Sequence, residues 1–190
     1  MTVRGTKVLG ISGSLRRDSH NTSLLRAAAE LLPSGAELEM AEIADLPLYS
    51  EDLDTDLAPA PVQRLREAIA SADAIVISTP EYNASIPGGL KNAIDWASRP
   101  FPNHVFRDKP VLVIGASTGL FGAVWAQAEL RKVLDHIGAR VLDSELPVGQ
   151  AHEALGEHGI GEQAISAELE RQLAELVALV PDQAHEPVAA

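Results

Sequence analysis

Residues 74–97, AIVISTPEYNASIPGGLKNAIDWA, decide the fold of this 190-residue chain. The stretch opens with Ala74–Ser78, a short apolar run rich in β-branched residues, which predicts a strand buried on both faces. It closes with a helical pattern over Gly88–Ala97, in which Leu90 and Ile94 share one face. Between the two lies a polar turn that contains Pro-Glu-Tyr-Asn. In an open parallel sheet such a turn lies outside the carboxyl end of a strand, where ligands bind.

Working outward from this stretch, strand and helix patterns alternate along the whole chain. Parallel strands need helical crossovers, and five strands in a short unit favour the flavodoxin-like order over a Rossmann-like one. We therefore predict a flavodoxin-like, doubly wound three-layer α/β sandwich with a five-stranded parallel sheet of order 2-1-3-4-5. The predicted strands are Lys7–Ser12, Glu37–Ile43, Ala74–Thr79, Val111–Ala116 and Arg140–Leu142, the last extended by Leu146–Val148. The predicted helices are Asn21–Leu32, Val62–Ser71, Gly88–Ala97, Val124–Ile137 and Glu162–Val180.

Domain organisation and composition set the limits of the function. Residues 1–181 are expected to form a single domain, and residues 182–190, which are small, polar and broken by proline, a disordered tail. No apolar stretch approaches the ~20 residues of a membrane span, so a cytoplasmic protein is expected. The net charge of −12 argues against nucleic acid and membrane surfaces as partners. With no cysteine in the chain, redox chemistry would need a cofactor.

The first strand runs into a loop suited to a phosphate group. Residues 10–22, GISGSLRRDSHNT, supply several hydroxyls, the guanidinium of Arg16, the amide of Asn21 and the start of a helix. A phosphate monoester is bound by such a set, through charge-assisted bonds and the N–H groups of a helix N-terminus. The alternative is that Ser19 or Asn21 only caps the helix while Arg16 is a surface charge. The loop matches neither a Walker motif nor a dinucleotide-binding Gly-x-Gly-x-x-Gly turn.

A third polar loop follows the strand that ends at Ala116. Its three glycines, within residues 115–122, allow close approach of a ligand, and Ser117 and Thr118 offer donors. Taken alone, it is equally well explained as a plain strand-to-helix turn. In the predicted strand order, however, the loops after Ser12, Thr79 and Ala116 converge on one edge of the sheet.

At these motifs the chain resembles the NADPH-dependent FMN reductases of flavodoxin-like fold, which include soluble quinone and chromate reductases. The resemblance covers about residues 7–142 and depends on Gly13-Ser14-Leu15-Arg16 with Ser19 and Asn21, and on the motif over residues 80–96. It implies FMN as cofactor and NADPH as donor, with NADH as an alternative. It also implies a phosphate site in the first loop, ring and ribityl contacts in the second, and Ser117 near the ring edge. His20 stands where relatives often have an aromatic or apolar residue. The implied cofactor-binding residues are Ser14, Leu15, Arg16, Ser19, His20, Asn21, Pro80, Glu81, Tyr82, Asn83 and Ser117.

Three functions remain open at this stage. The first is an FMN-dependent NAD(P)H oxidoreductase that passes hydride to quinones, free flavin or similar acceptors by a ping-pong mechanism. The second is a flavodoxin-type electron carrier with little turnover, although the first loop lacks the Thr-rich phosphate motif of such carriers. The third is use of the same fold without flavin. No side chain is predicted to act as a catalytic acid, base or nucleophile, because FMN brings its own chemistry.

Several single residues carry further expectations. Glu81 is expected to pair with a cation, within the chain or across a subunit boundary, rather than to act as a general base. Tyr82 is expected to stack on the ring or anchor an interface. Trp96 and Trp125 indicate either a subunit interface, in a homodimer or homotetramer, or ordinary core packing. No metal site is expected, because position 156 is Gly where the zinc motif begun by His152-Glu153 would need His. Arg99 and Arg107 are candidate contacts for a ribose phosphate of the donor. The remaining histidines are expected at the surface: His104, His136, His158 and His185.

Overall fold

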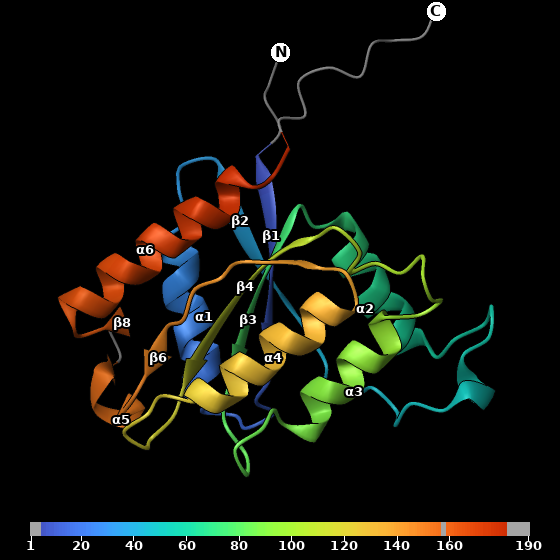
Figure 1. Cartoon of the computed structure of the whole chain (residues 1–190), viewed down its shortest axis with the longest axis horizontal. Coiled ribbons are helices and arrows are strands. Elements are labelled where there is room, and N and C mark those ends of the chain that lie inside the picture. Colours follow the sequence, from blue (N-terminus) through green and yellow to red (C-terminus); the bar gives the residue numbers. More distant parts are fainter. Residues whose placement is uncertain (1–4, 157–158, 182–190) are drawn as a thin grey trace, which may run out of the picture.

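The sheet has the predicted order, β2-β1-β3-β4-β5, with all neighbours parallel. A computed structural model describes residues 5–156 and 159–181 (Figure 1), so the predicted tail over 182–190 lies outside the described residues, as does His158. The strands are β1 (Thr6–Ser12), β2 (Ala36–Ala41), β3 (Ala74–Thr79), β4 (Pro110–Ala116), β5 (Arg140–Val141), β6 (Pro147–Val148), β7 (Leu155–Gly156) and β8 (Gly159–Ile160). The helices are α1 (His20–Glu30), η1 (Glu51–Leu53), α2 (Ala60–Ser71), α3 (Gly88–Ala97), α4 (Val124–His136), α5 (Ala151–Ala154) and α6 (Gln163–Ala178).

The predicted fifth strand is divided into two short pieces along the same neighbour. β5 pairs with the start of β4 and β6 with its end, where Gly115 faces Pro147 and Ala116 faces Val148. The chain then forms α5 and the small antiparallel β7–β8 ribbon, which periodicity did not reveal. These short elements matter for function because β6 and α5 lie directly beside the loop that leaves β4.

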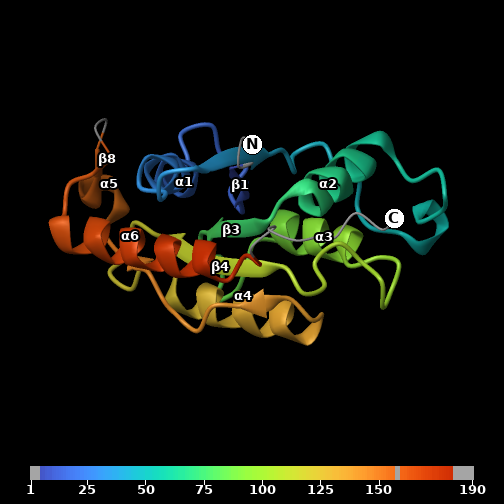
Figure 2. The same ribbon diagram turned by 90° about the horizontal axis from the view of Figure 1, so that it is seen from above.

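Helices cover both faces of the sheet. Alternate residues of each central strand enter opposite cores, as the strand period of two requires: in β3, Ile75 and Ile77 pack on one side, Ala74 and Val76 on the other. The first core is closed by α2, α3 and α4, and the second by α1 and α6. Figures 1 and 2 show α2 and α3 lying side by side. The part of the chain that the structure describes contains no helix long and apolar enough to cross a membrane.

Trp96 belongs to the core, which is one of the two alternatives that the sequence left open for it. Its side chain is fully buried, and its indole Nε1 donates a hydrogen bond to the Pro47 carbonyl at 2.8 Å. Asn92, one turn earlier, also donates to Pro47 and accepts from the Tyr49 N–H. These contacts fasten the long connection after β2 to α3. Trp125, in contrast, is 51% exposed at the start of α4.

His104 is also buried, against the expectation that it lies at the surface. Burial, opposed by the Ile137 backbone and assisted by Arg107, holds the pKa of His104 below its ordinary value. As the pH falls through about 6.5, the His104 imidazole therefore takes up a proton in the unfolded chain but stays neutral in the folded chain. The contribution of neutral His104 to stability is complete above that pH and is lost as the pH falls through it.

We expect the free energy of unfolding to decrease between pH 7 and pH 5, and His104→Phe to flatten this decrease. Urea unfolding at a series of pH values measures the slope for both proteins. His136→Phe, at an exposed histidine of α4, is the matched control and should leave the slope unchanged. Parallel curves for the parent and His104→Phe would contradict the assignment.

Candidate functional site

Three loops meet around one cavity of about 280 Å³ at the carboxyl edge of the sheet, the lower edge in Figure 1. They are the loops that follow β1, β3 and β4, as predicted. Of the cofactor-binding residues implied by the sequence, only Leu15 and Asn83 are outside the lining, while Ala116 and Thr118 are added to it. The lining residues are Ser14, Arg16, Ser19, His20, Asn21, Pro80, Glu81, Tyr82, Ala116, Ser117 and Thr118.

The first loop is held in shape by its own hydroxyls. Thr22 Oγ1 donates to Ser12 Oγ at 2.9 Å, and the Arg16 N–H donates to Ser14 Oγ. Gly13 begins the loop in a confined place, where a Cβ would lie 2.9 Å from Leu90 Cδ2 and 3.3 Å from the Ser78 carbonyl oxygen. These contacts fix the course of the loop, and Arg16 is exposed.

The start of α1 offers free backbone donors to the cavity. Ser19 caps the helix, since its Oγ accepts from the Thr22 N–H at 3.3 Å, and its carbonyl accepts from Ser23. Within residues 5–156 and 159–181, the His20 and Asn21 N–H groups have no such partner. Unpaired amides at the positive end of a helix form an anion site. Capping by Ser19 and anion binding are thus compatible here.

The side chain of Asn21 joins two of the loops. Its Oδ1 accepts from Ser78 Oγ at 2.8 Å and from the Ala116 N–H at 3.0 Å, while its Nδ2 donates to the Ala116 carbonyl at 3.0 Å. The amide is only 3% exposed. Sequence reasoning placed this side chain on a phosphate, but its hydrogen bonds connect α1 with β3 and β4. Its backbone N–H has no hydrogen-bond partner among the described residues.

The second loop is a tight two-residue turn. Tyr82 and Ser85 exchange both backbone hydrogen bonds, and Asn83 and Ala84 between them have positive φ angles of 54° and 59°. Those angles are typical of a type I′ turn, where asparagine is favoured. Asn83 therefore lies at the exposed tip, outside the cavity lining, while the ring of Tyr82 is 53% exposed beside it.

Glu81 caps a neighbouring helix. Its Oε2 accepts from the Trp125 and Ala126 N–H groups at 3.1 and 3.2 Å, at the start of α4. The N-cap residue of that helix, Ala123, has no side chain able to do so. Among the described residues, the partner of Glu81 is thus the positive end of a helix and not a cation. This contact ties the second loop to the element that follows the third. A cation across a subunit boundary stays a prediction.

The third loop rests on β6 and α5. Ser117 N–H donates to the Val148 carbonyl, and the Gly119 N–H donates to Ser117 Oγ. Gly122 has a positive φ of 57°, and a Cβ there would lie 2.3 Å from the Pro147 carbonyl carbon. Glycine is required at this close approach, which explains part of the glycine content of the loop. Among the described residues, the Thr118 N–H has no hydrogen-bond partner and remains available to a ligand.

Charge in the cavity comes mainly from Arg16. Burial, then Arg16, then His152 of α5 lower the pKa of His20, which disfavours the protonated imidazole. Arg99 lies beyond the far end of α3, about 15 Å of helix from the site, and donates to Tyr49 Oη. Arg107 approaches Gly138 at the end of α4, also away from the cavity.

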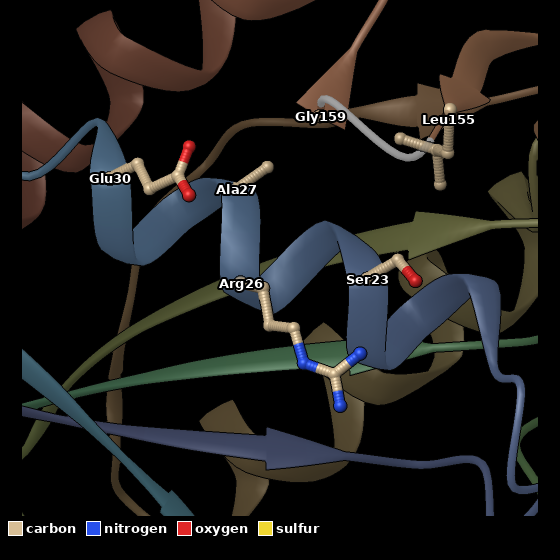
Figure 3. A pocket seen from close by; sticks show the side chains of 7 residues that line it. Ser23, Arg26, Ala27, Glu30, Leu155 and Gly159 are labelled. Atoms are coloured by element: carbon tan, nitrogen blue, oxygen red, sulfur yellow. The ribbon is translucent and has the colours of Figure 1, made fainter.

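A larger cavity of about 530 Å³ lies elsewhere, along the outer side of α1 (Figure 3). It is bounded by Ser23, Ala27 and Glu30 of the helix and by Leu155 and Gly159 of the β7–β8 ribbon. It contains none of the loop residues at the strand ends. Its size does not make it the better candidate, because the loops after β1, β3 and β4 converge on the smaller cavity.

Known proteins share both sequence and fold with this chain. The family described as NADPH-dependent FMN reductase matches residues 6–153. An NAD(P)H-dependent FMN reductase of Pseudomonas aeruginosa is 47% identical over 154 residues, covering 80% of this chain and 83% of the relative. A 2-hydroxy-1,4-benzoquinone reductase of a Burkholderia species is 47% identical over 131 residues, covering 69% of this chain and 71% of the relative.

A solved structure agrees with these matches. FerB, a flavoenzyme NAD(P)H:(acceptor) oxidoreductase of Paracoccus denitrificans, superposes with a TM-score of 0.82 and 37% identity, covering 92% of this chain and 97% of FerB. The resemblance inferred from the two loop motifs is confirmed, together with the flavodoxin-like fold. The chain belongs to the family of NADPH-dependent FMN reductases.

Proposed function

We propose that the chain is an FMN-dependent NAD(P)H oxidoreductase that reduces quinones, free flavin or similar acceptors by a ping-pong mechanism. The observation that carries the proposal is the convergence of three loops on one cavity that has an arginine and a helix N-terminus at one end. Quinones are favoured as acceptors because one relative is named a 2-hydroxy-1,4-benzoquinone reductase and others quinone reductases.

The phosphate end of FMN would be held by the first loop and α1. Arg16 supplies a charge-assisted hydrogen bond, Ser14 and Ser19 supply hydroxyls, and the free N–H groups of His20 and Asn21 supply backbone donors. Leu15 lies next to these residues but lines the opposite side of the loop. The donor set fits a dianion, because the described part of this cavity contains only one carboxylate, Glu81, and that group caps α4.

The ring end would lie between the second and third loops, against Pro80, Tyr82 and Ser117, with Asn83 near the ribityl chain. When bound, FMN supplies the hydride chemistry, and the protein orients and tunes it. Two backbone N–H groups without partners in the described chain, those of Glu81 and Thr118, are available to the pyrimidine edge. Donors at that edge stabilise negative charge and so favour two-electron reduction.

The mechanism would use one exposed ring face in turn for donor and acceptor. Tyr82 leaves that side of the site open, because its own side chain is half exposed. Donor and acceptor would occupy that side of the site in turn, the acceptor entering after the oxidised donor has left. Sharing one face prevents a ternary complex and therefore predicts ping-pong kinetics.

Anaerobic mixing of the FMN-loaded protein with NADPH tests the function. We expect rapid loss of flavin absorbance and, with a benzoquinone as acceptor, parallel lines in double-reciprocal plots. A protein that holds FMN but is not bleached would be a carrier. A protein that binds no FMN would use the fold for other chemistry. Intersecting lines would reject the ping-pong mechanism while leaving the reductase in place.

Assembly and location follow as parts of the same proposal. Phe121 and Trp125 pack edge to face at 5.2 Å, and both are more than half exposed, which supports a homodimer or homotetramer formed through the start of α4. An enzyme that draws on NAD(P)H works where that donor is held, which supports the cytoplasm.

A further inference from the structure

The first loop has a second cavity on its other side. It has a volume of about 330 Å³ and lies between this loop, α1 and the segment that leaves β2. It shares Ser14 and Arg16 with the cofactor cavity, so the two are separated only by the loop. The lining residues are Ser12, Ser14, Leu15, Arg16, Arg17, Thr22, Arg26, Met40, Ala41, Glu42, Ile43 and Ala44.

Three arginines line this cavity without an ion pair. Arg16, Arg17 and Arg26 are exposed, and none has a carboxylate partner among residues 5–156 and 159–181. Elsewhere in the described chain, arginines such as Arg66 and Arg131 are paired with acids, as expected for a net charge of −12. What sets Arg16, Arg17 and Arg26 apart is that all three line one cavity.

The cavity is built by one face of α1. Thr22 and Arg26 are four residues apart and share that face. Arg26 also lines the larger cavity, together with Ser23 and Ala27. Figure 3 shows the Arg26 side chain on the side of α1 away from Leu155 and Gly159. Its guanidinium can therefore donate hydrogen bonds to a ligand in the cavity beside the first loop.

The chemistry of the lining fits one end of a nucleotide. Guanidinium groups bind a phosphate monoester through paired N–H bonds. Leu15, Met40 and Ile43 add apolar surface of the kind that an adenine ring contacts. Glu42 is the only acid in the described lining, and it opposes an anion. Arg99 and Arg107, the sequence-based candidates for such a contact, lie away from both cavities.

We propose that this cavity receives the 2′-phosphorylated ribose of the nicotinamide donor and so makes the enzyme prefer NADPH over NADH. The inference rests on the proposed function, because it concerns the donor of that reaction. NADH carries a neutral hydroxyl where NADPH carries the phosphate. The arginines therefore contribute binding energy to NADPH alone.

Calorimetric titration of the FMN-loaded protein with adenosine 2′,5′-bisphosphate, and with AMP, tests this directly. We expect the bisphosphate to bind at least tenfold more tightly than AMP. Arg17→Ala and Arg26→Ala should each weaken the binding of the bisphosphate severalfold to tenfold and leave the binding of AMP unchanged. Glu42→Gln should strengthen the binding of the bisphosphate. Arg17 and Arg26 do not line the cofactor cavity, so FMN content should stay constant. Arg64→Ala, an exposed arginine of α2 outside both cavities, is the control for loss of charge.

Steady-state kinetics provides the second readout: the two arginine variants should raise the KM for NADPH and leave that for NADH unchanged. Equal binding of bisphosphate and AMP, or variants that behave like Arg64→Ala, would overturn the inference. Inorganic phosphate binding as tightly as the bisphosphate would make this a simple anion site and overturn it too. In each of these cases, a protein that holds FMN and loses its flavin absorbance on mixing with NADH would leave the proposed function intact. A protein that holds no FMN and responds to neither NADH nor NADPH would reject the proposed function itself.

Discussion

Arg16→Ala is expected to weaken FMN binding about tenfold to a hundredfold while leaving the melting temperature of the apoprotein unchanged. A charge-assisted hydrogen bond contributes about 1.5–3 kcal/mol, which corresponds to that range of dissociation constants. The side chain is exposed and has no ion pair within the described residues, so folding loses little when it is removed. Fluorescence titration of the apoprotein with FMN measures the affinity, and a thermal melt measures the stability.

Two comparisons sharpen the Arg16 experiment. Riboflavin lacks the phosphate, so its affinity should be the same for the parent and for Arg16→Ala. Arg17→Ala removes the same charge one residue later but does not line the cofactor cavity, and should retain FMN. An unchanged FMN affinity in Arg16→Ala would show that the first loop does not hold the phosphate.

Asn21→Leu is expected to destabilise the fold by about 3 kcal/mol or more, a large part of the 5–15 kcal/mol typical of a domain. Leucine is close to asparagine in size, so the main loss is of hydrogen bonds and not of volume. The change leaves Ser78 Oγ and both backbone groups of Ala116 without their partner in a buried place. Since the same contacts join the first and third loops, FMN affinity should fall as well. Chemical denaturation gives the loss of stability.

Asn83→Gly is the matched control for this prediction. Asn83 is an exposed asparagine in a positive-φ turn position, which glycine also accepts. Its stability should remain within about 0.5 kcal/mol of the parent. If Asn21→Leu were as stable as the parent and lost only FMN, the side chain would act on the phosphate, as the motif first suggested.

The fold and the cofactor family could be predicted from sequence because both depend on local patterns. Buried strands such as β3 and β4 are continuous apolar runs, and a parallel sheet follows from the helices between them. The motif after β3 is long, and each of its parts has a local meaning, such as a turn that favours asparagine at Asn83. These features allowed the strand order, the family and FMN to be inferred before any contact was known.

Individual partners could not be predicted in the same way. Glu81 needs a positive group, but sequence does not say that the N-terminus of α4, more than forty residues later, will supply it. Trp96 and Trp125 both lie on amphipathic helices, yet only the packing of the connection after β2 buries the first. His104 is likewise a polar residue in a loop that tertiary contacts enclose.

Taken alone, the sequence determined which segments form strands and helices, which loops lie at one edge of the sheet, and which family the chain belongs to. The tertiary structure decided what each polar side chain touches: Asn21 joins strands, Arg66 and Arg131 are paired with acids, and Arg16, Arg17 and Arg26 line one cavity. The reason is physical. Periodicity and turn chemistry act between near neighbours, whereas a hydrogen bond or an ion pair depends on which distant segment the fold brings within about 3 Å.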